Sequence, residues 1–470
     1  MDERDRIIEE LLKREIVIEP DVLPYIIERG GVNYVSDFAN RYGSLGYVTV
    51  KDINNTTKSE KKAENKIGGK ASASEYDWNY EILLTANVHM EATGSAEDFH
   101  NLFLDRFEKL HSILKHRRAL VNARRISKLS DGYVATIGMV NDVRRTSSGR
   151  TIFEIEDPTG TLTCMIRGNV FLLKDEVIGV RGKYNSSKRI MYLDKEEDII
   201  RPDVRWVREK RKINENLSVA IISDTHVGSK TFIRERWEKF LNWLKSGEDE
   251  AGTVKYLIIA GDLVDGIGVY PNQEEELEIT DIFKQYEVFA EYLKEVPDYV
   301  KVMAIPGNHD IVRNAEPQPA LPKEIRDMFD SNVVFLSNPA MVSIHGYKFT
   351  IYHGASLNNL VELIPGMDYQ KTDKIMEYML KFRHLSPVYG EKVPIVPYDR
   401  DYLVMDPQPD VLVTGHVHAF SYGIYKGIHM VNASTWQKQT KYQKMMNFNP
   451  DPGKVAILNM NRDEMIVKSF

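Results

Sequence analysis

The sequence predicts a layered α/β domain in the C-terminal half of the chain, preceded by an all-β barrel and a small N-terminal helical module. Three observations predict this organisation. From residue 217 onward short apolar runs alternate with helical stretches, over residues 130–200 apolar and polar residues alternate, and residues 1–45 carry apolar residues at helical spacing. The expected limits are 1–50 for the helical module, 51–75 for a disordered linker, 76–129 for a connecting strand and helix, 130–205 for the barrel and 210–470 for the α/β domain.

The first fifty residues contain two short amphipathic stripes. Ile7, Ile8 and Leu11 share one helical face, and Pro20 begins a second helix. Such a small module buries little apolar surface, so we expect it to dock on a partner or on the rest of the chain. Residues 51–75 hold few apolar residues and many Lys, Ser, Asn and Gly, so burial would not offset the entropy lost on ordering them.

Residues 96–116 are predicted to form one helix. Phe99, Phe103, Phe107 and Leu110 recur at spacings of three and four, with charged residues between them. A basic cluster marks the end of this helix and the residues after it, namely Lys115, His116, Arg117, Arg118, Arg124 and Arg125.

Residues 130–200 contain several short strands whose connections are rich in turn formers, which predicts a small barrel. The order is a strand, a basic hairpin, a strand ending in Asp157-Pro-Thr-Gly, and further strands, and it resembles an oligonucleotide-binding (OB) fold. Arg144, Arg145 and Arg150 at the hairpin would contact phosphates in such a fold. The alternative is a solvated turn on a structural barrel, and it stays open because aromatic residues that could stack on bases are sparse here.

The composition excludes several classes of protein. The chain has 470 residues, of which 42% are hydrophobic and 28% charged, as in a soluble globular protein of several domains. The net charge of −7 argues against a globally basic surface but leaves room for a local basic groove. The single cysteine, Cys164, excludes an intramolecular disulfide and is expected to be a small core residue. No apolar stretch approaches the ~20 residues of a membrane span and no signal peptide is evident, so we expect a cytoplasmic protein without a membrane partner.

Polar side chains follow each strand that the α/β domain is expected to contain. These strands are predicted at Leu217–Ile222, Tyr256–Ala260, Val302–Ile305, Phe349–Tyr352 and Val411–Val413. The groups that follow them, in the same order, are Ser223–His226, Gly261-Asp262, Gly307–Asp310, His353-Gly354 and Gly415–His418. Loops at the carboxyl ends of strands converge on one crevice, so five such groups of carboxylate, amide and imidazole side chains predict an open metal site.

These residue types suit two divalent metal ions. Two ions about 3.5–4 Å apart can hold a phosphodiester and lower the pKa of a bound water. A ligand that bridges both ions must be a carboxylate, because its two oxygens can face two cations, and Asp262 suits that position. Imidazole, amide and carboxylate ligands together fit Mn²⁺, Fe²⁺ or Zn²⁺ better than a thiolate-preferring ion. We expect Mn²⁺, with Fe²⁺, Zn²⁺ or Mg²⁺ as alternatives.

The five groups resemble the Asp-x-His, Gly-Asp, Gly-Asn-His-Asp, His and Gly-His-x-His motifs of the calcineurin-like metallophosphoesterase superfamily. The resemblance implies a layered αββα fold. It also implies that Asp224, His226, Asp262 and His418 hold a first ion, and that Asp262, Asn308, His353 and His416 hold a second. His309 would bind no metal but would stabilise the transition state or protonate the leaving oxygen, with Asp310 as a residue that orients it.

A second resemblance narrows the substrate. A barrel directly before a phosphoesterase resembles the B-type small subunits of replicative DNA polymerases. Segments at 96–110, 383–387 and 432–443 are similar to the small-subunit family of archaeal DNA polymerase D. This resemblance implies a 3′→5′ proofreading exonuclease that acts on DNA 3′ ends beside a separate, large polymerising subunit. The eukaryotic B-type subunits have lost most metal ligands, whereas this chain keeps all of them.

Two other functions stay open. The chain could be a catalytically silent scaffold that joins the polymerase subunit to other replication proteins, or a phosphatase acting on proteins or small phosphoesters. The intact ligand set argues against the first, and the barrel and basic clusters argue against the second. A sliding clamp is a further candidate partner, because residues 443–448 faintly suggest a clamp-binding peptide, although the usual paired aromatic residues are missing.

Several single residues have two interpretations. Arg383 and His384 are predicted to grip the DNA backbone, although His384 could instead cap a loop. Trp436 is expected to pack in the core rather than stack on a base. His345 and His429 lie outside the motifs and are expected to be structural or surface residues.

Overall fold

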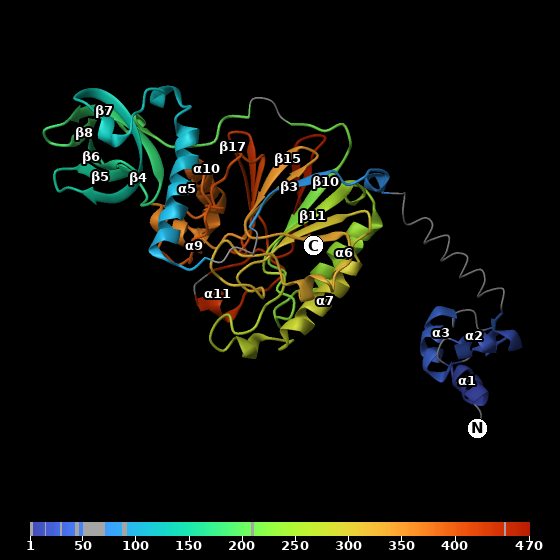
Figure 1. Ribbon diagram of the computed structural model, residues 1–470. Coiled ribbons are helices and arrows are strands. Elements are labelled where there is room, and N and C mark those ends of the chain that lie inside the picture. Colours follow the sequence, from blue (N-terminus) through green and yellow to red (C-terminus); the bar gives the residue numbers. More distant parts are fainter. Residues whose placement is uncertain are drawn as a thin grey trace. The chain divides into compact units, whose positions relative to one another are not determined.

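The computed structural model describes residues 3–14, 16–28, 31–42, 47–49, 71–86, 92–207, 211–445 and 448–470 (Figure 1). The chain divides into two compact units, residues 1–70 and residues 71–470. Within the described ranges, no helix combines the length and the apolar character needed to cross a membrane.

The N-terminal unit is built from short helices and one pair of parallel strands. Its elements are α1 (Glu3–Leu12), β1 (Val17–Ile18), α2 (Leu23–Glu28), α3 (Val35–Tyr42) and β2 (Tyr47–Val48), with 3₁₀ turns at Pro20–Val22 and Gly31–Tyr34. Ile7, Leu11, Val22, Ile26 and Phe38 are among the buried residues of its own small core. Ile7 and Leu11 of the predicted stripe therefore face inward in this unit, whereas Ile8, which was placed on the same face, is 41% exposed.

The first large sheet of the second unit supplies three of the loops that carry the predicted ligands. Its strands, in spatial order, are β13 (Val333–Phe335), β12 (Lys301–Ile305), β11 (Val254–Ala260), β10 (Ser218–Ile222), β19 (Lys454–Asn459) and β20 (Glu464–Ser469). Strands β10 to β13 are parallel, whereas β19 and β20 are antiparallel to their neighbours. Every residue of β10, β11 and β12 is buried, as expected of central parallel strands that are covered on both faces.

The second large sheet supplies the other two loops. Its strands, in spatial order, are β17 (Ser421–Tyr425), β18 (Ile428–Asn432), β16 (Val411–Thr414), β15 (Tyr347–Ile351), β14 (Ala340–Ile344) and β3 (Tyr80–Thr85). Strands β15, β16 and β18 are parallel to one another. The edge strand β3 pairs antiparallel with β14, although it lies more than 250 residues earlier in the chain.

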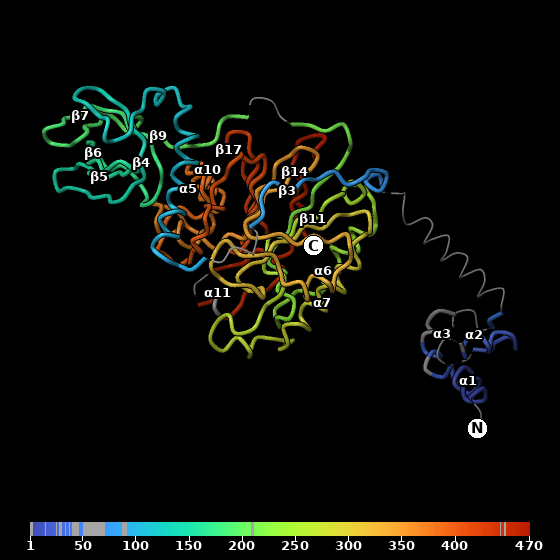
Figure 2. Tube along the Cα trace, viewed as in Figure 1, coloured from blue at the N-terminus to red at the C-terminus, as the bar shows by residue number. Residues whose placement is uncertain are grey.

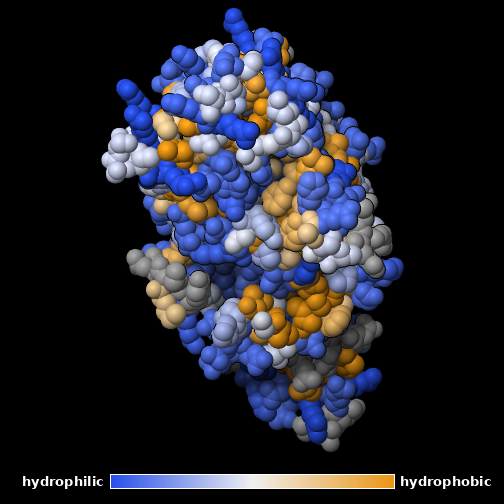
Figure 3. All heavy atoms as spheres, turned by 60° about the vertical axis from the view of Figure 1, so that its left-hand side comes forward, coloured by the Kyte–Doolittle hydropathy of each residue, from blue (hydrophilic) through white to orange (hydrophobic). Residues whose placement is uncertain are grey.

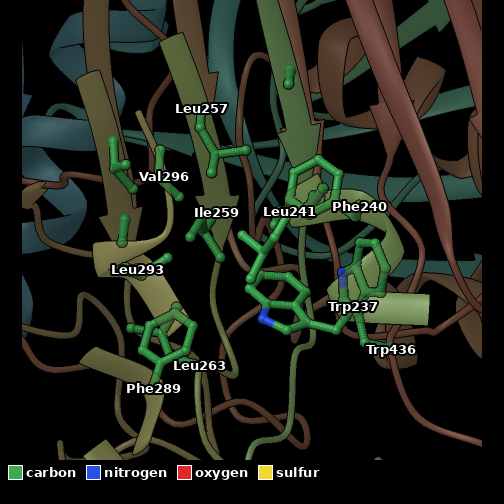
Figure 4. Packing of buried hydrophobic residues seen from close by; sticks show 14 of the residues in the cluster. Trp237, Phe240, Leu241, Leu257, Ile259, Leu263, Phe289, Leu293, Val296 and Trp436 are labelled. Carbon is green, nitrogen blue, oxygen red and sulfur yellow. The ribbon is translucent and has the colours of Figure 1, made fainter. Parts of the chain in front are cut away.

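Hydrophobic clusters join these sheets to each other and to the helices. Trp237 and Phe289 belong to a cluster between the first sheet and its helices (Figure 4). Ile258 and Val342 belong to a cluster that contains residues of both sheets, and Leu412 belongs to one that includes helical residues beside the second sheet. The helices are α6 (Arg234–Ser246), α7 (Ile282–Lys294), α8 (Lys323–Arg326), α9 (Leu357–Leu363), α10 (Thr372–Phe382) and α11 (Lys441–Met445).

A β barrel precedes these sheets in the chain. Its strands are β4 (Gly132–Arg145), β5 (Arg150–Asp157), β6 (Gly160–Arg167), β7 (Val177–Asn185), β8 (Ile190–Leu193) and the short β9 (Ile199–Ile200). β4 pairs with β5 and β7, β6 pairs with β5 and, in parallel, with β8, and β8 pairs with β7, so five strands close into a ring. Figure 2 labels β4 to β7 of this barrel. This five-stranded ring is consistent with the predicted OB-type barrel.

Helix α5 (Ala96–Leu114) lies next to the barrel in the chain and packs on it. The sequence predicted a helix at 96–116, and the structure confirms the helix with an end two residues earlier. Ser95 and Asp98 form a capping box at its first turn, which satisfies backbone N–H groups that have no partner inside the helix. Phe107 and Leu110 are buried in a cluster that also contains Ile137 of the barrel.

The predicted disordered linker needs one correction. Residues 51–70 lie outside the described residues, but Ser72–Glu75 form a 3₁₀ turn. Ala73 is fully buried in the cluster that joins both sheets, and the Ser72 hydroxyl donates to the carbonyl of Gly252 over 3.0 Å. Small residues that look like linker in the sequence are ordered here because the neighbouring core accepts a methyl group.

Candidate metal centre

The predicted ligands lie in loops that follow the parallel strands of both sheets. Asp224 and His226 follow β10, Asp262 follows β11, Asn308 and His309 follow β12, His353 follows β15, and His416 and His418 follow β16. All five strands that the sequence predicted are confirmed, with bounds that move by no more than two residues. The loops of two sheets therefore bring side chains from five distant parts of the sequence to one place.

The backbone of these loops is strained. Five of the seven predicted ligands have a positive φ, namely Asp224 (52°), His226 (48°), Asp262 (50°), His416 (72°) and His418 (53°). A non-glycine residue in this region costs on the order of 1–3 kcal/mol, and such residues gather at functional sites. Gly307 allows a close approach, because a Cβ atom there would collide with the Asp262 carboxylate. The loops therefore hold these side chains in position with a backbone conformation of raised energy.

One group of side chains that could hold a metal consists of Asp224, His226 and His418. His226 Nε2 lies 3.0 Å from His418 Nε2, and His418 Nε2 lies 3.3 Å from Asp224 Oδ1. All three residues are at most 6% exposed. Two imidazole nitrogens and a carboxylate oxygen therefore face the same buried point.

A second group consists of Asp262, His353 and His416. His353 Nε2 lies 3.3 Å from Asp262 Oδ2, 3.3 Å from His416 Nδ1 and 3.0 Å from Asn308 Oδ1. The same Asp262 oxygen lies 3.7 Å from His226 Nε2 in the first group. The Asp262 carboxylate therefore stands between the two groups, as a bridging ligand must.

The buried carboxylates at this centre need positive charge close to them. Burial disfavours a charged His226 ring, but Asp265, Asp262 and Asp224 outweigh burial and raise its pKa to about 9. Burial likewise opposes charge on His353, yet Asp262 and Asp224 raise its pKa to about 10. Among the described residues, no Lys or Arg forms an ion pair with Asp224 or Asp262. The donor set fits divalent metal ions, which would displace these protons and neutralise the carboxylates.

His309 lies beside the two groups. With His226 and Asp262 it forms a third set of side chains that could hold a metal, and Asp265 orients its ring. Its Nδ1 lies 2.7 Å from the carbonyl oxygen of Asp265, so this nitrogen carries a hydrogen and donates it. The Asp265 carboxylate lies 3.0 Å from His226 Nδ1. Asp310, which the sequence suggested as the orienting residue, instead accepts hydrogen bonds from the backbone of Gly307 and Leu263 and from the Tyr286 hydroxyl. The local motif did not reveal Asp265, because its partners belong to other loops.

Two side-chain amides, which also line the cavity at this centre, contact ligand histidines. The Asn358 amide lies 2.8 Å from His416 Nε2, and the Gln443 amide lies 2.8 Å from His418 Nδ1. Partners of this kind fix the orientation of a ligand ring and are part of a working metal site. The cavity in front of the ligands has a volume of about 330 Å³, and Tyr270 and Tyr369 contribute to its wall.

The family follows from relatives of known name. A "DNA polymerase II small subunit" of Thermoplasma acidophilum is 40% identical over 477 residues, which cover 100% of this chain and 93% of that relative. The chain belongs to the DNA polymerase II small-subunit family. Members from Archaeoglobus fulgidus (44% identical, 77% of this chain and 75% of that relative) and Methanothermobacter thermautotrophicus (40%, 82% and 82%) carry the same name. This family comprises the small subunits of archaeal DNA polymerase D, as the resemblance implied.

A family model and two solved structures were also compared with this chain. The family model for the B-type subunit of DNA polymerases alpha and epsilon matches residues 219–422. A solved structure described as an archaeal phosphodiesterase covers 54% of this chain and 100% of that protein at 14% identity, but its TM-score is 0.29. Vps29 with Zn²⁺ from Entamoeba histolytica reaches 15% identity and a TM-score of 0.28, with 53% of this chain and 90% of that protein covered. Likenesses this weak carry no argument.

The two residues at 383 and 384 that were predicted to contact DNA are both largely buried, and only Arg383 lines a hollow. His384 is 1% exposed, its Nε2 lies 2.9 Å from the Asp401 carboxylate, and its Nδ1 accepts from the backbone N–H of Ser386. Both ring nitrogens are therefore occupied, which fits the loop-capping interpretation and not a DNA contact. Arg383 is 4% exposed, and its Nε donates to the carbonyl of Met405.

The arginines of the barrel hairpin are exposed. Arg144 and Arg145 end β4 and Arg150 begins β5, and the Arg144 side chain is paired with Asp142. Figure 3 brings this side of the molecule forward and shows a surface on which hydrophilic residues predominate. Nothing in these contacts favours phosphate binding over a solvated turn, so both interpretations of the hairpin stay predictions.

Three structural assignments from the sequence are confirmed. Trp436 is 1% exposed, and its ring packs edge-on against Trp237 at 4.9 Å between centroids (Figure 4). Cys164 is fully buried, and burial raises the pKa of its thiol. His345 and His429 contact Tyr256 and Asp463, respectively, and belong to none of the metal-binding groups.

Proposed function

We propose that this chain is a metal-dependent 3′→5′ exodeoxyribonuclease that edits DNA 3′ ends as the small subunit of archaeal DNA polymerase D. The observation that carries the proposal is the position of Asp262 between two groups of buried ligands that converge from both sheets. Membership of the polymerase small-subunit family makes DNA the substrate class that fits this site best. The large polymerising subunit is the proposed partner, since the relatives are named as small subunits.

The ligand assignment follows the two groups. The first ion would be held by Asp224, His226, Asp262 and His418, and the second by Asp262, Asn308, His353 and His416. When bound, two such ions would polarise the phosphodiester and supply a nucleophilic water at neutral pH. Mn²⁺ is the proposed ion, because nitrogen and oxygen donors are mixed and no thiolate is present in either group.

The proton transfer is assigned to His309. Because its Nδ1–H is donated to the Asp265 carbonyl, Nε2 is the atom left to exchange a proton with a substrate in the cavity. Burial lowers the pKa of this ring, although Asp262 and Asp265 oppose the effect. A ring fixed by one hydrogen bond and free at its other nitrogen is suited to protonate the leaving 3′ oxygen.

The test uses the complex of this chain with the large subunit and a DNA oligonucleotide labelled at either end. His309→Ala should reduce Mn²⁺-dependent shortening from the 3′ end by about 10²–10⁴-fold, the usual contribution of a positioned acid or base. His100→Ala is the matched control, since His100 is an exposed histidine on α5, outside the cavity. Unchanged shortening by the His309 variant would exclude the mechanism, and shortening from the 5′ end would exclude the polarity. The same assay without the large subunit measures how much of the activity this chain has alone.

A scaffold without catalysis is the second candidate. It is favoured by one observation, the match to a family model for the B-type subunit of DNA polymerases alpha and epsilon. Metal analysis of the purified chain separates the two functions. About two equivalents of Mn²⁺ that are lost in Asp262→Asn would support the nuclease. No bound ion, together with no Mn²⁺-stimulated cleavage, would support the scaffold.

A further inference from the structure

A second hollow, of about 340 Å³, lies away from the metal centre and shares no lining residue with it. Three arginines from different parts of the chain meet there: Arg117 after helix α5, Arg205 after the barrel, and Arg383 at the end of α10. His116 and Gln408 also line it. Guanidinium groups repel one another, so their convergence in one hollow needs a reason.

Arg383 is the most buried of the three arginines that line this hollow. The residue is 4% exposed, and its Nε is used by the carbonyl of Met405. Burial lowers its pKa to about 10. Its terminal nitrogens make no hydrogen bond to any described residue, and Asp406 Oδ1 lies 3.7 Å from Nη2. Asp406 is itself half exposed, so it neutralises this cation only weakly.

Arg117 is fixed but incompletely satisfied. Its Nη2 donates to the backbone carbonyls of Pro202 and Asp203. Its Nε is buried and has no hydrogen-bond partner among the described residues. A buried charged donor without a partner is costly, so Arg117 is held here at an energetic cost, and its Nη1 makes no hydrogen bond to the described residues.

Arg205 is the exposed member of the three arginines that line the hollow. Its backbone is pinned by Gln408, whose amide accepts from Arg205 N (2.8 Å) and donates to Arg205 O (2.9 Å). Its side chain is exposed and forms no ion pair or hydrogen bond with the described residues. His116 Nδ1 is used by the carbonyl of Ser112, which leaves Nε2 available. The Arg205 guanidinium and His116 Nε2 therefore have no hydrogen-bond partner among the described residues.

The charges that face this hollow favour an anion. The carboxylates near the arginines are Asp406 and Asp203. Asp203 Oδ2 accepts from Tyr425 and Lys426, while its Oδ1 is buried without a hydrogen-bond partner among the described residues. Three guanidinium groups therefore face two carboxylates, of which Asp203 is already paired with Lys426 and Asp406 is half exposed. We propose that this hollow is a phosphate-binding site, in which Arg117, Arg205 and Arg383 donate to the oxygens of one phosphate group.

Guanidinium groups match the tetrahedral oxygens of phosphate, because each presents several donors in a fixed plane. The phosphate can come from a nucleic-acid backbone or from a free anion or nucleotide. Trp206, the residue after Arg205 in the sequence, is 71% exposed but does not line the hollow, so it does not decide between these sources. The experiment distinguishes these sources.

The test compares the full-length wild-type chain with Arg205→Gln and with Arg326→Gln, all in EDTA so that the metal centre cannot hold phosphate through metal ions. Arg205 is chosen because its side chain supports no other residue, whereas Arg117 and Arg383 also hold backbone carbonyls. Arg326 is the matched control, an exposed arginine on α8 outside the hollow. Inorganic phosphate binding is followed by ³¹P NMR, and binding of a fluorescein-labelled single-stranded oligonucleotide by anisotropy over a range of salt concentrations.

The expected result is that Arg205→Gln weakens binding roughly tenfold, as for one lost charge-assisted hydrogen bond, while Arg326→Gln binds as wild type. For a nucleic-acid phosphate, the slope of log affinity against log salt should also fall by about 0.7 for Arg205→Gln alone. A loss confined to inorganic phosphate would assign the site to a free anion. Equal binding of both ligands by all three proteins would overturn the proposal. So would a defect of Arg205→Gln only in association with the large subunit, which would make the hollow a protein interface.

Discussion

The metal centre and the buried network around Asp401 contain the same kinds of residue but differ in one respect. Both place a histidine against a buried aspartate, His353 on Asp262 at 3.3 Å and His384 on Asp401 at 2.9 Å. At Asp401 the chain supplies its own cation, because the buried Arg106 guanidinium pairs with the same carboxylate at 2.7 Å. At Asp262 no described Lys or Arg does so.

The buried arginine separates the structural cluster at Asp401 from the candidate metal-binding site at Asp262. A buried carboxylate must find positive charge, and Arg106 gives it permanently, so the Asp401 network is closed. At the candidate metal centre no described Lys or Arg supplies the positive charge. It must come from protons on His226 and His353 or from bound metal ions. The sequence predicted a functional role for His384 as well as for the metal ligands, and of these two clusters only the Asp401 network contains a buried arginine.

The largest expected effect is on the closed network. Asp401→Asn leaves Arg106 buried without its ion-pair partner, which should lower the free energy of unfolding by about 3–5 kcal/mol. Denaturant unfolding measures the change. Exonuclease activity per folded molecule should stay unchanged, because Asp401 does not line the metal cavity. A variant of normal stability with a specific loss of cleavage would reverse the comparison.

A buried acid beneath the metal centre gives the next effect. Burial raises the pKa of Glu316 to about 7, although the Tyr352 hydroxyl donates to it. A raised folded-state pKa means that the folded protein keeps the proton between pH 4.5 and about 7 while the unfolded chain loses it. Stability from this group is therefore complete below pH 4.5 and is lost as pH rises toward 7.

Glu316→Gln should remove that dependence. Relative to wild type, the variant should gain up to about 3 kcal/mol of stability between pH 4.5 and pH 7, at ~1.4 kcal/mol per unit of pKa shift. Urea unfolding of both proteins at four pH values in this window measures the difference. A constant difference at all four values would show that Glu316 ionises normally.

A smaller effect is expected at the open centre. Asp265→Asn should keep the carbonyl that holds His309 but weaken the contact between the Asp265 carboxylate and His226 Nδ1. Loss of such a supporting residue typically lowers metal affinity or activity by about 10–100-fold. Mn²⁺ titration by calorimetry, with unfolding as a control, measures it. Reduced stability at full Mn²⁺ affinity would place Asp265 with the closed networks instead.

The smallest effect concerns the barrel hairpin. If Arg145 contacts a DNA phosphate, Arg145→Gln should weaken oligonucleotide binding a few-fold and reduce the salt dependence by about one ion. Lys188→Gln, an exposed charge change on another turn of the same barrel, is the control. Equal binding by the two variants would support the solvated-turn interpretation.

The sequence by itself determined the parts that are local. An apolar run followed by ligand-type residues fixes both a buried strand and the loop at its end, so the five strands could be predicted, together with the residues that gather at the candidate metal centre. What only the tertiary structure decided depends on which distant segments meet. Asp265 holds His309, and β3 pairs with β14, across separations that no local pattern encodes. Arg383 and His384 are neighbours in sequence, yet one opens into a basic hollow and the other is locked to Asp401. Burial and the charge of distant neighbours set these roles, and both quantities exist only in the folded chain.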